Sequence, residues 1–172
     1  MSFTNIEIKA KTHKAAQIRK HLQDSGADFK GIDHQTDTYF NVPKGRLKLR
    51  QGNIENTLIY YERENQAGPK QSQFNLVQVT DGNNLKELLT NSLGVKVVVE
   101  KEREIYFIDN VKFHLDTIRQ LGNFVEIEAS NRFQPLSLEE LHKQCNFYID
   151  LFVITPADMV NVSYSDMLLA LL

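Results

Sequence analysis

The sequence predicts an α+β fold in which about eight antiparallel strands close into a barrel with a few flanking helices. Segments of alternating polar and apolar residues recur along the whole chain and are separated by short turns, as in strands joined by hairpins. Helical spacing of apolar residues occurs in only a few stretches. No linker or internal repeat divides the chain, so we expect residues 1–172 to form a single domain.

The first half of the chain predicts a strand, a helix and then a meander. The first strand is expected at residues 3–10, and Thr12 offers an N-cap for a helix that carries Ile18 and Leu22 and ends at Gly26. The strands of the meander are expected at residues 29–41, 46–50 and 57–63.

The second half predicts strands interspersed with helices. Residues 64–71 are polar and have no apolar period, which indicates a mobile loop. Asp81 caps a leucine-rich helix that ends at Gly94. The remaining strands are expected at residues 74–79, 95–107, 111–118 and 122–130, and the remaining helices at 138–152 and 163–169.

Composition excludes several classes of protein. Hydrophobic residues make up 41% and charged residues 24% of the chain, and the net charge is −2, so no global positive field favours nucleic acid or an anionic membrane. The first residues lack the features of a signal peptide, and no apolar run approaches the roughly 20 residues of a membrane span. We therefore expect a cytoplasmic protein. Its single cysteine, Cys145, excludes an internal disulfide and is expected to be a buried structural thiol.

Like charges gather on single faces of the predicted strands. Side chains alternate between the faces of a strand, so Arg46, Lys48 and Arg50 share one face, as do Glu126 and Glu128. A solvated face explains any one such strand. Several runs of one sign would repel one another across neighbouring strands unless a ligand of opposite charge lies between them. A polyphosphate with a divalent cation fits both kinds of run, because basic side chains bind phosphate oxygens and carboxylates bind Mg²⁺ or Mn²⁺.

Six short motifs strengthen this interpretation. They lie at residues 5–9 (NIEIK), 37–40 (DTYF), 46–50 (RLKLR), 100–103 (EKER), 114–128 (HLD followed by LGNFVEIE) and 163–169 (SYSDMLL). In order and spacing they resemble the motifs of the CYTH superfamily, which is named for class IV (CyaB-type) adenylyl cyclases and thiamine triphosphatases. The resemblance covers essentially the whole chain.

The resemblance implies a closed eight-stranded antiparallel tunnel that holds a triphosphate-containing small molecule with Mg²⁺ or Mn²⁺. The residues that it assigns to phosphate binding are Lys9, Arg46, Lys48, Arg50, Lys101 and Arg103. Those that it assigns to the metal and to catalysis are Glu7, Asp116, Glu126 and Glu128. Further candidates are Asn5, Lys11, Arg63 and His114. A sheet protein of this kind is also compatible with a homodimer.

Two residues depart from the family pattern. Asn5 replaces the first glutamate of the N-terminal motif, which keeps an oxygen ligand but removes a charge. Glu62 stands where the family usually has a lysine, so Arg63 either replaces that lysine through a local bulge or leaves this strand with a weaker hold on phosphate.

The resemblance favours an adenylyl cyclase, which converts ATP to cyclic AMP and pyrophosphate. The alternatives are hydrolysis of tripolyphosphate, thiamine triphosphate or a nucleoside triphosphate, and binding of a polyphosphate or nucleotide without catalysis. Tyr39, Tyr60 and Tyr61 are expected to pack in the wall or to shape the tunnel mouth, where an organic ring would stack.

Overall fold

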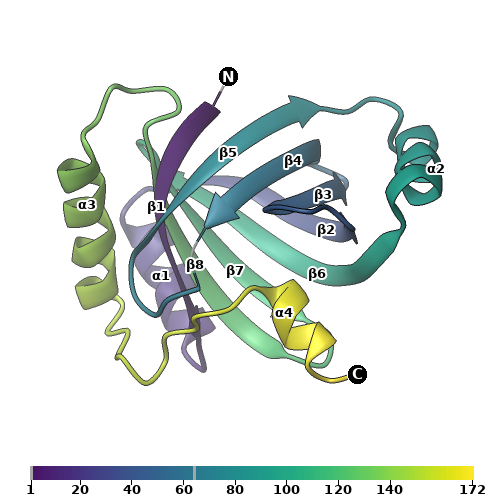
Figure 1. Ribbon diagram of the computed structural model, residues 1–172. Helices are drawn as coiled ribbons and strands as arrows, with labels where there is room; N and C mark the ends of the chain where they lie inside the picture. The colour runs from purple at the N-terminus through teal and green to yellow at the C-terminus, as the bar shows by residue number, and fades with distance from the viewer. Residues whose placement is uncertain (1, 64) are drawn as a thin grey trace.

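The computed structural model describes residues 2–63 and 65–172, and its strands form a closed antiparallel barrel (Figure 1). The strands are β1 (Ser2–Lys11), β2 (Asp28–Phe40), β3 (Arg46–Gln51), β4 (Asn56–Arg63), β5 (Lys70–Gln78), β6 (Val95–Ile108), β7 (Val111–Ile118) and β8 (Gly122–Ser130). Around the barrel they follow the order β1-β5-β4-β3-β2-β6-β7-β8, and β8 pairs with β1 to close the ring. The predicted fold class is confirmed.

The helices lie outside the barrel wall or at its end. They are α1 (Ala15–Asp24), α2 (Gly82–Leu93), α3 (Leu138–Leu151) and α4 (Tyr164–Leu169). Figure 1 shows α1 and α3 on one side of the barrel and α2 on the opposite side. Among the helices of the described residues, none is long and apolar enough to cross a membrane.

The largest apolar core lies on the outer face of the barrel. Ile6 and Ile8 point outward from β1 and are fully buried together with outward residues of β7 and β8. Ile18 of α1 and Leu141 of α3 cover them. Cys145 belongs to this core, and burial raises the pKa of its thiol to about 12, so the predicted structural role fits its surroundings. Because this core lies outside, the inner face is left for polar residues.

Two local predictions need correction. β5 begins at Lys70, which pairs with Glu7 of β1, so the last two residues of the predicted loop 64–71 belong to a strand; residue 64 itself lies outside the described residues. The N-cap of α1 is Lys14, and the Thr12 hydroxyl accepts a hydrogen bond from the Lys14 amide at 2.9 Å. Thr12 therefore stabilises the turn before the helix instead of capping it.

Candidate functional site

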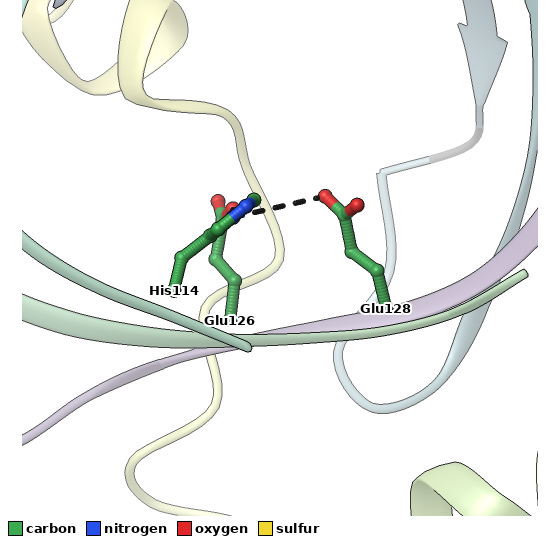
Figure 2. Close-up of side chains that lie close together, drawn as sticks. All are labelled: His114, Glu126 and Glu128. Carbon is green, nitrogen blue, oxygen red and sulfur yellow. Dashed lines mark hydrogen bonds and ion pairs between the residues drawn. The ribbon is translucent and has the colours of Figure 1, made fainter. Parts of the chain in front are cut away.

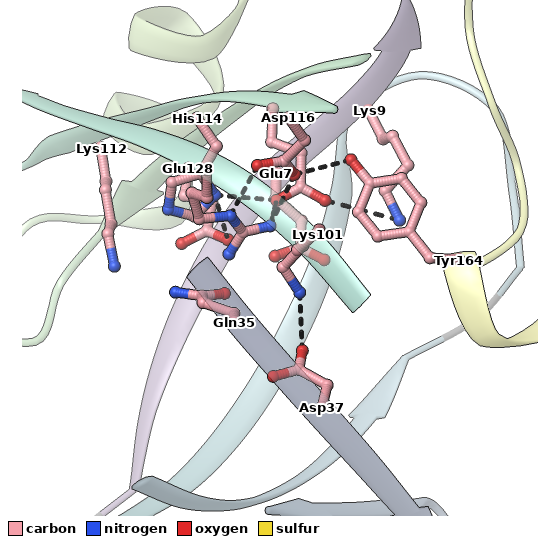
Figure 3. A network of polar contacts seen from close by, with 12 residues as sticks. Glu7, Lys9, Gln35, Asp37, Lys101, Lys112, His114, Asp116, Glu128 and Tyr164 are labelled. Atoms are coloured by element: carbon pink, nitrogen blue, oxygen red, sulfur yellow. Dashed lines mark hydrogen bonds and ion pairs between the residues drawn. The ribbon is translucent and has the colours of Figure 1, made fainter. Parts of the chain in front are cut away.

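The inward side chains of the strands line a cavity of about 620 Å³. Strand alternation puts Asn5, Glu7 and Lys9 of β1 on this inner face, as their spacing predicts, and all three are buried. Figure 3 shows the charged network, with Lys112 at one side and Tyr164 at the other. The middle of the barrel interior therefore carries a network of charged side chains, with aromatic and aliphatic residues at other parts of the cavity wall.

Helix α4 covers one end of this cavity. The Tyr164 hydroxyl donates a hydrogen bond to Asp116 at 2.8 Å, and the Lys9 ammonium lies 3.6 Å from the centre of the Tyr164 ring. Arg46 forms an ion pair with Asp166 of the same helix at 2.7 Å. Ligands therefore have their access at the opposite end, which we call the mouth. Its lining includes Phe3, Ile54, Phe107, Lys112, Arg132 and Phe133.

A first cluster gathers cations around Asp37, whose side chain is fully buried. Arg50 donates two hydrogen bonds to its carboxylate, each of 2.9 Å. The Lys101 and Lys48 ammonium groups lie 2.7 and 3.4 Å from the same carboxylate. Burial opposes ionisation of Asp37, but these cations outweigh it and hold the pKa of Asp37 well below its usual range. Burial also lowers the pKa of Lys101 to about 7, although Asp37 opposes the shift.

A second cluster gathers acids beside His114 (Figure 2). His114 Nδ1 lies 2.8 Å from Glu126 and 4.0 Å from Glu128. Burial, reinforced by Arg103, lowers the pKa of His114 to about 3, so the imidazole is neutral at pH 7. Burial and the neighbouring Glu7 raise the pKa of Glu128 to about 7. Among the described residues, Glu128 forms no ion pair with a lysine or arginine, whereas Glu126 lies beside both Arg103 and Lys9.

The second cluster fits a divalent cation. Ligand atoms of His114, Glu126 and Glu128 lie within 4.8 Å of one another. If Nδ1 of the neutral ring donates to Glu126, the lone pair of Nε2 is left, and this buried atom has no hydrogen-bond partner among the described residues. A carboxylate–histidine pair of this kind orients the imidazole towards a metal. A cation here would also relieve the repulsion that raises the pKa of Glu128.

Arg103 bridges two acids of the inner face. It donates hydrogen bonds of 2.7 Å to both oxygens of Asp116 and one of 3.0 Å to Glu126. Lys9 lies 3.5 Å from the other oxygen of Glu126. Asp116 is therefore held by Arg103 and Tyr164, so its carboxylate serves to position Arg103 in this structure.

The predicted site residues are not all brought together. Lys9, Lys48, Arg50, Lys101 and Arg103 line the cavity, as do Asn5, Glu7, Arg63, His114, Glu126 and Glu128. Arg46 does not line it, because it lies at the closed end against α4. Lys11 has the same strand parity as Lys9 but lies two residues further along β1, past the Tyr164 ring, and is exposed.

Arg63 reaches the interior without a bulge, so that alternative was wrong. The register of β4 is regular on both sides, with Arg63 opposite Ser72 and Glu62 opposite Gln73. Arg63 forms an ion pair with Glu7, whereas Glu62 points outward and accepts a hydrogen bond from Tyr60. The inward basic position of this strand is therefore filled.

Several interior residues were missed by the sequence interpretation. Asp37 begins the motif at residues 37–40, but no role was predicted for it. Lys70 was predicted to lie in a loop. Lys112 has the same strand parity as His114. Glu55 lies in the turn before β4 and binds Lys112 at 2.6 Å and Arg50 at 3.2 Å. Of these four residues, Lys112 was the one that strand parity could have placed on the inner face.

The turn that carries Glu55 is held by a buried acid. Asp33 accepts hydrogen bonds of 2.9 Å from the amides of Ile54 and Glu55. At Gly52 in the same turn, a Cβ atom would lie 2.4 Å from an Asp33 oxygen, so a larger residue does not fit there. The position of Glu55 at the mouth is thereby fixed.

A closed antiparallel barrel with basic and acidic clusters on its inner face has the fold of triphosphate-tunnel proteins. The model of the CYTH domain matches residues 4–146, and the chain belongs to the CYTH domain family. Proteins of this family are typically cyclases or triphosphatases and generally depend on a divalent metal. No curated protein matches the sequence.

Solved structures of the same fold cover nearly the whole chain. The PH1012 protein of Pyrococcus horikoshii OT3 is 25% identical with a TM-score of 0.78, covering 94% of this chain and 98% of its own. A candidate adenylate cyclase of Vibrio parahaemolyticus is 16% identical with a TM-score of 0.78, covering 95% of this chain and 97% of its own. A candidate adenylyl cyclase of Hippeastrum with a dominant triphosphatase activity is 12% identical with a TM-score of 0.63, covering 97% and 94%.

Proposed function

We propose that this chain is a metal-dependent enzyme that acts on a triphosphate, and that its reaction is the cyclisation of ATP to cyclic AMP and pyrophosphate. The observation that carries the proposal is the order of charges along the cavity. Lys9 and Lys101 lie beside Tyr164 at the closed end, whereas His114 and Glu128 lie between them and the mouth (Figure 3).

This order sets the direction of a bound nucleotide. Inward positions on a strand are about 7 Å apart, so Lys9 and Glu7 are one phosphate-sized step apart on β1. The two terminal phosphates would bind deep in the cavity, where Lys48 and Lys101 supply positive charge. The α-phosphate would then lie beside Glu126, and the nucleoside would face the mouth. Cyclisation breaks the bond that joins the α-phosphate to the departing pyrophosphate.

The protein would act by positioning and charge neutralisation, with little covalent work. The deep lysines and Arg50 would hold the leaving pyrophosphate and stabilise the charge that it gains. Glu7, Glu126, Glu128 and His114 would hold Mg²⁺ or Mn²⁺, which when bound supplies Lewis-acid charge at phosphate oxygens. Arg103, fixed by Asp116, would orient the α-phosphate from its position beside Glu126.

A triphosphatase is the second candidate. It is supported by the dominant triphosphatase activity of the Hippeastrum protein of the same fold. The same residues would serve if the terminal phosphate lay beside the acids and water attacked it. The two reactions therefore differ in which phosphorus reaches the acidic cluster.

The test is to incubate the purified chain with ATP and Mg²⁺ or Mn²⁺ and to separate the products. Cyclic AMP with equimolar pyrophosphate is the expected result. Orthophosphate without cyclic AMP would overturn the cyclase in favour of the triphosphatase. Tight binding of ATP without turnover would overturn both reactions and leave a non-catalytic binding protein.

A further inference from the structure

The cavity mouth carries a layered stack of aromatic rings and one guanidinium group. The Arg132 guanidinium carbon lies 5.1 Å from the centre of the Phe3 ring and 4.9 Å from that of Phe133. Phe3 stacks in turn on Phe74, with ring centres 5.6 Å apart and an interplanar angle of 10°. All four residues line the same cavity as the charged clusters. We call Phe3, Arg132 and Phe133 the mouth stack.

The segment that carries the mouth stack is fixed to the barrel. The Thr4 amide donates a hydrogen bond to the Asn131 side chain at 2.9 Å, and the Asn131 amide donates to the Thr4 carbonyl at 3.2 Å. The Arg132 amide donates to the Ser130 hydroxyl at 3.2 Å. These bonds fix the segment that follows β8, the strand of Glu126 and Glu128, against β1, which carries Phe3.

Phe133 is the most exposed ring in the described parts of the chain, with 83% of its surface accessible. Covering this ring with the apolar face of a ligand would remove apolar surface from water and so favour binding. A planar ring is the natural partner, because aromatic side chains and guanidinium groups both stack on nucleobases. Among the described residues, no carboxylate forms an ion pair with Arg132, so no neighbouring acid offsets its positive charge at the rim.

From these contacts we propose that the mouth stack binds the base of a nucleoside triphosphate and thereby selects nucleotides over tripolyphosphate and thiamine triphosphate. This inference rests on the proposed function, since the phosphates must lie in the cavity below. Ser130 is one inward step, about 7 Å, from Glu128, which leaves room for a ribose between the acidic cluster and the stack. A neutral base stacks on the exposed Phe133 ring without repulsion from the nearby Arg132 charge, whereas the cationic ring of thiamine would be repelled by that charge.

The test compares the binding of ATP, thiamine triphosphate and tripolyphosphate by calorimetry, with EDTA present so that metal-dependent turnover consumes none of them. In Phe133→Ala, ATP should bind about tenfold more weakly, whereas the dissociation constant of tripolyphosphate should be unchanged. Phe147→Ala is the matched control, because Phe147 is also exposed, at 60%, but lies on α3 outside the barrel. It should change neither constant.

The outcomes separate the two proposals. If Phe133→Ala leaves ATP binding unchanged, or weakens ATP and tripolyphosphate equally, the mouth stack does not read the base. A loss of affinity for thiamine triphosphate alone would also overturn the inference. If the wild-type chain binds none of the three ligands in EDTA and turns over none of them with Mg²⁺ or Mn²⁺, the proposed function itself is wrong.

Discussion

Asp37 and Glu128 are carboxylates on the inner face of one barrel, but their surroundings differ. Asp37 lies within reach of Arg50, Lys48 and Lys101, which outweigh its burial and keep its pKa low. Glu128 lies beside Glu7 and Glu126, and burial with their negative charge raises its pKa to about 7. Asp37 is surrounded by cations, whereas Glu128 has no lysine or arginine within ion-pair distance among the described residues.

The contrast shows how a barrel is prepared for a ligand of mixed charge. Removing charged groups from water is costly, so a buried cluster with surplus charge of one sign is stable only when its surroundings or a ligand offset that charge. The cluster at Asp37 favours an anion, and the cluster at His114 favours a cation. A metal–triphosphate complex would satisfy both at once.

The largest effect is expected from removing one negative charge from the acidic cluster. Glu126→Gln keeps the shape of the side chain and leaves Arg103 paired with Asp116, so the fold should survive. Turnover should fall by a factor of about 100 or more, because a charged group beside the metal and the α-phosphate is lost. Steady-state kinetics with ATP and Mg²⁺ or Mn²⁺ provide the measurement.

Glu102→Gln is the matched control, since Glu102 lies on the outer face of β6 and its side chain is 53% exposed. Its turnover should equal that of the wild type. Full activity in Glu126→Gln would remove Glu126 from the metal site.

Removing one cation from the other cluster should affect binding more than chemistry. In Lys101→Ala, Asp37 keeps Arg50 and Lys48, so the fold should hold. Tripolyphosphate affinity should fall about 10-fold or more, the cost of one charge-assisted contact. Calorimetry measures it, with Lys96→Ala on the exposed face of the same strand as control. An unaltered dissociation constant would show that Lys101 serves Asp37 alone.

The two clusters should respond to pH with opposite signs. Burial lowers the pKa values of Lys9 and Lys101 to about 7, so at pH 8 both are mostly deprotonated. A bound polyanion favours their charged forms. Polyphosphate binding should therefore take up protons, and its affinity should fall as pH rises above about 7. Metal binding needs ionised Glu128, so it should release protons and strengthen as pH rises through about 7.

Calorimetry at pH 8 in buffers of different ionisation enthalpy measures the proton uptake by tripolyphosphate, and the same titration with Mn²⁺ at pH 6.5 measures the release. Heats that do not depend on the buffer, or protons moving in the same direction for both ligands, would contradict the contrast between the clusters.

The smallest expected effect concerns the closed end. Tyr164→Phe keeps the ring over Lys9 but removes the hydrogen bond to Asp116. The free energy of unfolding should fall by about 1 kcal/mol and the melting temperature by about 2–4 °C. Turnover should change by less than about twofold. Tyr60→Phe, which loses a solvent-exposed bond to Glu62, should leave the melting temperature nearly unchanged.

A tenfold loss of turnover in Tyr164→Phe would mean that Asp116 takes part in catalysis through more than its hold on Arg103. Thermal denaturation and the kinetic assay with ATP therefore have to be carried out on the same protein preparations.

Strand parity was sufficient to predict much of the inner face. Lys9, Lys48 and Glu126 line the cavity as their alternation indicates, and the bounds predicted for β7 and β8 agree with the structure. Parity failed at strand ends, because it carries no information about depth. Lys11 has the inward parity but lies past Tyr164, and the side chain of Arg46 is held by α4.

Pairings between distant strands were beyond sequence reasoning. The contact of Asp37 with Lys101 joins residues 64 positions apart, and that of Glu55 with Lys112 joins residues 57 apart. Such contacts depend on the order of strands around the barrel, which alternation along a single strand does not contain. The tyrosines illustrate this, since both packing in the wall and a place at the mouth were expected alternatives: Tyr39 and Tyr61 pack in the wall with Tyr164 at the closed end, and Tyr60 binds the outward Glu62.

The apolar core of this molecule lies between the outer barrel face and the helices α1 and α3. Much of the apolar packing therefore lies on the opposite side of the strands from the charged lining, and the closed end adds an inward apolar cluster around Tyr39, Tyr61 and Tyr164. Substitutions of inward residues leave that outer packing intact, so an ancestral barrel is free to exchange one lining for another over evolutionary time. Descendants with the same architecture are then expected to diverge in the reactions they catalyse before they diverge in shape.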